Sequence, residues 1–177
     1  MNLIVGAPSW LVAILALTLV AAAVEDALRL RISNVTCAAV LVTALVAMGL
    51  HGFSSSLWQN AVVCIGILVI GMPIFAAGWL GGGDIKLLAA IGLWLDFRAA
   101  TGLVVAVLML GGLLALAFIV GRRIVRRENR ARQHDAKMPY GLAIVAGAFF
   151  ILGTQVMHKA SNPFIEKLRA AELERQN

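Results

Sequence analysis

The sequence predicts an all-α integral membrane protein that crosses the bilayer about six times. Of its 177 residues, 61% are hydrophobic and 14% are charged, whereas an ordinary soluble domain is about half apolar and a quarter charged. A spanning helix uses about 20 apolar residues, so the chain has room for five or six spans and short loops. This composition excludes disordered chains, nucleic-acid-binding modules and small secreted scaffolds.

Six apolar runs predict the spanning segments, and they cover about 8–24, 35–50, 60–80, 85–96, 99–120 and 139–157. The fourth run is short for a span unless the glycine-rich approach around residue 80 also lies at membrane depth. Irregular backbone at that depth must line a cavity walled by protein, because lipid cannot satisfy its hydrogen bonds. We therefore divide the chain into a membrane domain over 1–157 and a C-terminal tail over 158–177.

The distribution of basic residues predicts the orientation. The loops after the first, third and fifth runs hold ten basic residues, and the loops after the second and fourth hold only Arg98. Cytoplasmic loops carry the excess of Lys and Arg, so we expect both termini outside. Four basic residues in the tail oppose this orientation. The polar segment 121–137 is expected to be a solvated loop that sets topology, with anionic lipid headgroups as the alternative partner.

Both terminal segments leave alternatives open. The first run ends near Ala21-Ala22-Ala23, which is typical of a signal-peptide cleavage site. However, residues 2–9 carry no basic residue and the run is long enough to span, so we expect it to be retained. From Pro163 to Gln176, the apolar spacing fits an amphipathic helix on the membrane surface. A solvated tail fits this segment equally well.

Two carboxylates lie where a charge is unfavourable. Asp26, with Glu25 beside it, ends the first run, and Asp84 follows Gly81-Gly82-Gly83. Ionisable groups near membrane depth are functional candidates by default, and the loop assignment places both acids at the cytoplasmic face. If they approach each other, they share one proton. The ionised partner can then activate a water while the protonated partner polarises a peptide carbonyl.

This chemistry is aspartyl peptide hydrolysis, and it needs no metal or cofactor. The glycines before Asp84 suit it, because they let a substrate strand approach closely. The two cysteines form no CxxC pair, and the histidines lack partners at metal-ligand spacing. We therefore predict no cofactor, no metal ion and no nucleic-acid partner. Asp26 and Asp84 as ordinary helix-end residues are the alternative.

Two other classes of protein are alternatives to the peptidase. A small proton-coupled transporter would use the same acids as proton carriers, but it needs a water-filled path from both faces. It also needs acids nearer the bilayer midplane. A non-enzymatic assembly subunit of a secretion or pilus machine fits the composition but leaves the acids unexplained.

Three segments resemble the landmarks of the type IV prepilin peptidase family, in the family's order. Gly81–Leu88 (GGGDIKLL) looks like its GxGD motif. Asp26–Asn34 (DALRLRISN) resembles the first aspartate segment, with Ser33 where proline is usual. Met138–Ala143 (MPYGLA) resembles the Pro-Tyr-Gly opening of the last helix, with Leu142 in place of a common proline.

The resemblance implies a membrane aspartyl endopeptidase that removes the leader peptide of a prepilin or pseudopilin. Asp26 and Asp84 would be its catalytic pair, and cleavage would follow a small residue just ahead of the pilin's hydrophobic helix, near the cytoplasmic surface. Long members also carry a methyltransferase region with cysteine pairs, which this sequence lacks. It is therefore similar to the short form of Tad/Flp pilus systems. N-methylation is not expected, and the location would be the bacterial inner membrane.

The remaining motif residues carry weaker expectations. Lys86 is expected either to hold an anion or the charge of Asp84, or to snorkel to the interface. Asn34 and Tyr140 are expected to be hydrogen-bond donors near the acids, with a helix cap and an interfacial aromatic as the alternatives. Pro139 and Gly141 complete the third landmark. The four tryptophans fall near span ends and predict an interfacial belt.

Overall fold

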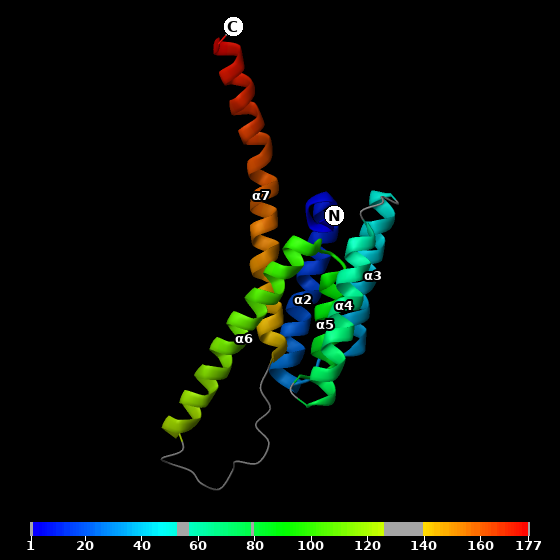
Figure 1. Ribbon diagram of the computed structural model, residues 1–177, viewed down its shortest axis with the longest axis vertical. Helices are drawn as coiled ribbons and strands as arrows, with labels where there is room; N and C mark the ends of the chain where they lie inside the picture. Colours follow the sequence, from blue (N-terminus) through cyan, green and yellow to red (C-terminus); the bar gives the residue numbers. More distant parts are fainter. Residues whose placement is uncertain (1, 53–56, 79, 126–139, 177) are drawn as a thin grey trace.

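The computed structural model describes residues 2–52, 57–78, 80–125 and 140–176. Every regular element in this part of the chain is a helix (Figure 1): α1 (Leu3–Gly6), α2 (Ser9–Arg29), α3 (Asn34–His51), α4 (Leu57–Ala76), α5 (Gly82–Gly92), α6 (Phe97–Val125) and α7 (Tyr140–Gln176). Five stretches within α2, α3, α4, α6 and α7 are long and apolar enough to cross a membrane. The prediction of an all-helical, polytopic membrane protein is confirmed.

Of the six predicted spanning segments, the fourth, over about 85–96, does not form a helix long enough to cross the membrane. It forms α5, which has 11 residues and is therefore about 16 Å long, roughly half the hydrocarbon thickness. The rings of Trp58, at the start of α4, and Phe97, at the start of α6, lie 5.7 Å apart. Consequently α5 and the loop 93–96 lead from the end of α4 back to the opposite end of the bundle, inside the protein.

The irregular backbone after α5 is buried, and protein groups satisfy its hydrogen bonds, as burial requires. The side-chain amide of Asn60 donates to the carbonyl of Leu93 at 3.0 Å. The N–H of Leu3, in the short helix α1, donates to the carbonyl of Trp94 at 2.9 Å. These contacts replace the helical hydrogen bonds that a full-length span would make.

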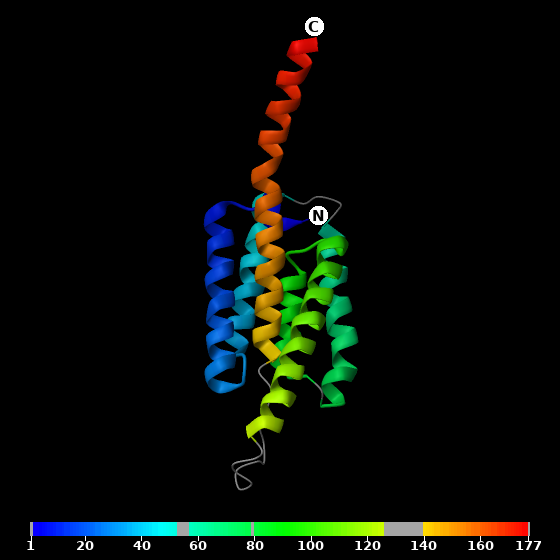
Figure 2. The same ribbon diagram turned by 90° about the vertical axis from the view of Figure 1, so that its left-hand side faces the viewer.

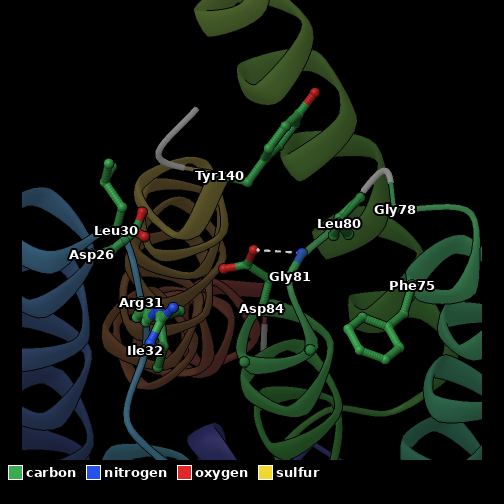
Figure 3. A pocket seen from close by; sticks show the side chains of 12 residues that line it. Asp26, Leu30, Arg31, Ile32, Phe75, Gly78, Leu80, Gly81, Asp84 and Tyr140 are labelled. Carbon is green, nitrogen blue, oxygen red and sulfur yellow. Dashed lines mark hydrogen bonds between the residues drawn. The ribbon is translucent and has the colours of Figure 1, made fainter. Parts of the chain in front are cut away.

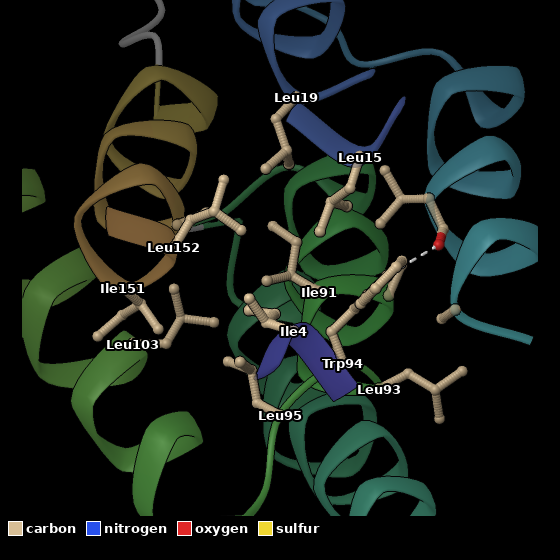
Figure 4. Packing of buried hydrophobic residues seen from close by; sticks show 14 of the residues in the cluster. Ile4, Leu15, Leu19, Ile91, Leu93, Trp94, Leu95, Leu103, Ile151 and Leu152 are labelled. Atoms are coloured by element: carbon tan, nitrogen blue, oxygen red, sulfur yellow. Dashed lines mark hydrogen bonds between the residues drawn. The ribbon is translucent and has the colours of Figure 1, made fainter. Parts of the chain in front are cut away.

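Trp94 does not belong to the predicted interfacial belt. Its side chain is 0% exposed, and its indole N–H donates to the carbonyl of Val40 at 3.4 Å. The prediction was wrong because the loop after α5 is enclosed by other helices (Figure 4). Trp10 and Trp58 are exposed at the starts of α2 and α4, as a belt requires, and Trp79 lies outside the described residues.

The core of the bundle runs along one face of each helix. On α2, Leu11, Leu15 and Leu19 recur every fourth residue and are each 1% exposed, which is the spacing of one helical stripe. Leu17 and Leu28 on the other faces are 68% and 78% exposed. Exposed leucines of this kind suit a helix whose outer face contacts lipid.

The chain's last helix continues far past the bundle. Figures 1 and 2 show α7 as one helix that projects beyond the other elements to the C-terminus. The proposed boundary between 157 and 158 therefore falls inside a continuous helix. The position of segment 158–177 on a membrane surface stays a prediction. Most of the basic segment 121–137, its residues 126–137, lies outside the described residues.

Candidate active site

A cavity of about 670 Å³ lies at the end of the bundle where α2 ends and α5 begins. It brings together groups from all three sequence landmarks (Figure 3), and its lining consists of Asp26, Leu30, Arg31, Ile32, Phe75, Gly78, Leu80, Gly81, Gly82, Gly83, Asp84 and Tyr140. Asp26 and Asp84 are 58 positions apart in the sequence, and both carboxylates face this space.

Asp26 is held rigidly at the last turn of α2. Its side chain is only 4% exposed, and its Oδ2 accepts a hydrogen bond from the N–H of Leu142 at 3.0 Å. Leu142 lies in the first turn of α7, where backbone N–H groups have no partner within the helix and where the helix dipole favours a negative charge. The start of α7 therefore provides a docking point for this carboxylate.

Gly141 explains why the third landmark needs a glycine. A Cβ at this position would lie 2.7 Å from Cγ of Asp26 and 2.9 Å from Cδ1 of Ile32. Real Cβ atoms do not approach other heavy atoms so closely, so α7 can approach Asp26 only because residue 141 has no side chain. Met138 and Pro139, the first two residues of this landmark, lie outside the described residues.

Asp84 occupies the first turn of α5, outside the five candidate spans. Its Oδ2 accepts a hydrogen bond from the N–H of Gly81 at 3.2 Å. Burial raises the pKa of the Asp84 carboxyl from 3.8 to about 6, and the negative charge of Asp26 acts in the same direction. The two acids are therefore close enough for one to make the other easier to protonate.

The glycines before Asp84 permit close packing on both sides of the α5 start. A Cβ on Gly83 would lie 3.0 Å from the backbone oxygen of Ile32. A Cβ on Gly81 would lie 2.8 Å from Oδ2 of Asp84. Gly83 thus lets the α2–α3 turn approach α5, and Gly81 leaves room for the carboxylate.

The turn between α2 and α3 carries three residues of the cavity wall. Leu30 adopts the left-handed conformation, with φ of 52°, which is uncommon for a residue with a side chain. Glu25 fixes the other end of this turn, because its Oε2 accepts from the N–H of Ser33 at 3.0 Å and from the hydroxyl of Thr36 at 2.7 Å. In the sequence, Glu25 stands out only as the neighbour of Asp26, and this role was not predicted.

Lys86 and Asn34 lie beside the cavity and not in its lining. The ammonium of Lys86 donates to Oδ1 of Asn34 at 2.9 Å, so this pair joins the start of α5 to the start of α3. Asn34 thus accepts a hydrogen bond here, and Ser33 is the residue that caps α3, through its hydroxyl and the N–H of Thr36. An effect of Lys86 on the charge of Asp84 stays a prediction.

In the described ranges, no three His, Cys, Asp or Glu side chains are grouped so that they could hold a metal ion. The chemistry that the cavity offers is that of two carboxylates with different surroundings, one buried and one partly exposed.

Comparison with known families agrees with this geometry. The model of the type IV leader peptidase family matches residues 13–120, which is more than half of the chain and includes both aspartates. Neither the comparison with curated proteins nor that with solved structures gives a match. Because the family match spans the two helices that supply the acids, the chain belongs to the type IV leader peptidase family, the aspartic peptidases that remove the leader peptides of prepilins.

Proposed function

We propose that Asp26 and Asp84 are the catalytic pair and that the enzyme processes Flp-type prepilins at the cytoplasmic face of a bacterial inner membrane. The observation that carries the proposal is the shared cavity, because two acids 58 positions apart line it together with the glycine segment. A pair in which one carboxyl is protonated and the other ionised is what peptide hydrolysis without a metal requires.

The two acids have different roles in the proposed reaction. Asp84 begins as the acid, because its raised pKa lets it hold a proton more readily than an ordinary aspartate does, and Asp26 begins as the carboxylate. Asp26 removes a proton from water as the water oxygen attacks the peptide carbonyl, and Asp84 gives its proton to the carbonyl oxygen. The tetrahedral intermediate then collapses. Its hydroxyl returns a proton to Asp84, Asp26 protonates the leaving nitrogen, and the C–N bond breaks.

The orientation follows from the charges at the cavity end of the bundle. Arg29 and Arg31 flank the end of α2, and Lys86 is the fifth residue of α5. The helix α6 starts at the opposite end and runs into the basic segment 121–137. Basic residues gather on the cytoplasmic side of membrane proteins, so the cavity faces the cytoplasm and both termini lie outside.

The substrate class rests on the absence of the cysteine pairs that accompany the methyltransferase region of the long members. The sequence has two cysteines, Cys37 and Cys64, and they form no CxxC motif. Neither Cys37 nor Cys64 forms a disulfide. We therefore propose leader removal without N-methylation, as in the short form that Tad/Flp systems use.

Co-expression with an Flp-type prepilin tests this proposal, with the size of the pilin read on a gel and its new N-terminus by mass spectrometry. We expect the wild type to produce a mature, unmethylated pilin, and inserted Asp26→Asn and Asp84→Asn variants to produce none. Asp96→Asn is the matched control, because Asp96 caps α6 away from the cavity and asparagine caps equally well. Normal processing by either site variant would contradict the catalytic pair. A methylated product would contradict the substrate class alone.

A further inference from the structure

A second cavity, of about 680 Å³, borders the candidate active site. Its walls come from α4 and α6, and α5 and the start of α7 form its floor. The lining is apolar except for the hydroxyl of Tyr140. Ile70 and Leu108 on its rim are 67% and 66% exposed, so the cavity is a groove open to the side of the bundle.

Two residues connect this groove to the catalytic cavity. Leu80 and Tyr140 line both spaces, and Figure 3 shows both side chains beside Asp84. A chain that leaves the catalytic cavity past Leu80 and Tyr140 therefore enters an apolar groove directly. Figures 1 and 2 show that α6 leans away from α4 toward this end of the bundle.

The wall formed by α6 is suited to a neighbouring helix. Gly111, Gly112 and Ala115 line the groove on this wall, and small residues allow two helix backbones to approach within a membrane. A Cβ on Gly112 would have no atom within 4 Å, so this position opens onto unoccupied space. The part of α6 that lines the groove, from Val104 to Ala115, is about 16 Å long. This length could contact about three turns of a neighbouring helix.

We propose that this groove binds the hydrophobic helix of the prepilin, directly after the cleaved bond. The inference rests on the proposed function, because the scissile bond must lie between Asp26 and Asp84 while the apolar helix that follows it needs an apolar site next to them. The shared lining of the two cavities provides that adjacency. A lipid acyl chain is the other occupant that the groove would suit, and the experiment separates the two.

The kinetic experiment compares Gly112→Leu with Gly153→Leu in purified full-length enzyme. Both glycines are exposed, helical and free of atoms within 4 Å of an added Cβ, but only Gly112 lines the groove. The substrates are the complete Flp-type prepilin and a shortened peptide that carries the leader, the scissile bond and only the first few residues after it. For Gly112→Leu we expect kcat/KM on the complete prepilin to fall about tenfold or more, mainly through KM, with peptide cleavage unchanged. Gly153→Leu should leave both rates unchanged.

A cross-linking experiment tests where the substrate helix binds without requiring cleavage. In an Asp84→Asn background with Cys37 and Cys64 replaced by alanine, Gly112→Cys should form a disulfide with a cysteine in the first turns of the substrate helix, and Gly153→Cys should not. Equal cross-linking through Gly112→Cys and Gly153→Cys would contradict the inference that the groove binds the prepilin helix. Equal loss of cleavage of both substrates in Gly112→Leu would contradict it as well. Loss of bound phospholipid in Gly112→Leu with unchanged prepilin kinetics would assign the groove to lipid instead. A wild type that cleaves neither substrate but cross-links through Gly112→Cys would overturn the proposed function and not the groove.

Discussion

The two aspartates of the candidate active site differ in how deeply they are buried and in which elements hold them. On the Asp26 side, the carboxylate is 4% exposed, accepts a backbone hydrogen bond from another helix and lies against Gly141 at the start of that helix. On the Asp84 side, the carboxylate is partly exposed and accepts from the N–H of Gly81, which precedes its own helix. The Asp84 side also borders the apolar groove.

The Asp26 side is therefore the fixed half of the active site, and the Asp84 side is the accessible half. Long-range contacts between α2 and α7 position Asp26 before any substrate binds. The glycine segment and Leu80 leave the Asp84 side open to an extended chain and to the groove. We infer that the Asp26 side orients the attacking water and that the Asp84 side admits the peptide. The following predictions test this division, from the largest expected effect to the smallest.

Replacing either aspartate should have the largest effect. Asp26→Asn and Asp84→Asn should each lower kcat/KM for prepilin cleavage by about 100–10,000-fold, the usual contribution of a general acid or base. Because the two acids act as a unit, the double variant should be scarcely worse than either single one. Rates of single turnover on purified prepilin measure this. Multiplicative losses in the double variant would show that the acids act independently.

Alanine at two glycines should separate the tight half from the open half. Gly141→Ala forces a Cβ to within 2.7 Å of Asp26 and should lower cleavage about tenfold or more and stability by about 1–3 kcal/mol, as overpacking does. Gly82→Ala meets only the edge of the Phe75 ring, at 3.3 Å, and that ring can turn. It should change cleavage less than about threefold, because alanine also favours the helix.

Cleavage rates and thermal unfolding in detergent measure this pair of variants. Gly153→Ala is the control for the general effect of a methyl group on an exposed helical glycine, since nothing lies within 4 Å of its Cβ position. Equal losses in Gly141→Ala and Gly82→Ala would contradict the difference between the two halves.

The pH dependence of Asp84 should report the charge of its partner. In the wild type, burial and the Asp26 charge raise the Asp84 pKa from 3.8 to about 6. Asp26→Asn removes the charge and leaves the burial, so the Asp84 pKa should fall but stay above 3.8. Infrared titration of the protonated carboxyl stretch of Asp84 measures this shift. An unchanged pKa in Asp26→Asn would mean that the two carboxyls do not interact.

The same shift sets the sign of two further pH effects. A raised pKa means that the folded state binds the proton more tightly, so this contribution to stability is present at low pH and is lost as the pH rises from about 4 to about 6. If Asp84 donates the proton in catalysis, kcat/KM of the free enzyme should also fall as the pH rises through about 6. A flat profile between pH 5 and 8 would contradict the assignment of Asp84 as the acid.

The sequence predicted the helical fold better than it predicted which residues of different helices are in contact. Apolar runs and charged loops locate helices because they depend on local composition. The burial of Trp94 and the depth of α5 depend on which helices surround them, and hydropathy contains no such information. The role of Glu25 was missed for the same reason, since its partner Ser33 becomes a neighbour only when the α2–α3 turn forms.

The two departures from the family pattern become intelligible only in three dimensions. Proline is usual at the positions of Ser33 and Leu142, and proline has no backbone N–H. Here the N–H of Ser33 donates to Glu25, and the N–H of Leu142 donates to Asp26. Each departure therefore adds a hydrogen bond to an acid at the end of α2, which no sequence pattern could reveal.

Proline at these two positions gives the smallest and most specific test. Leu142→Pro should keep α7 intact, because a first-turn residue needs no N–H for the helix, but it removes the donor to Asp26 and should lower kcat several-fold. Ser33→Pro removes the donor to Glu25 and the hydroxyl cap of α3, and should lower stability by about 0.5–2 kcal/mol with a smaller effect on kcat. Cleavage kinetics and thermal unfolding, measured on both variants, separate these outcomes.

Alanine variants at the same positions isolate the N–H from the side chain. Leu142→Ala keeps the donor to Asp26 and should retain wild-type kcat, and Ser33→Ala keeps the donor to Glu25 while losing only the hydroxyl cap. If Leu142→Pro and Leu142→Ala behaved alike, the hydrogen bond from α7 would contribute nothing to catalysis. The fixed position of Asp26 would then depend on its burial between α2 and Gly141 alone.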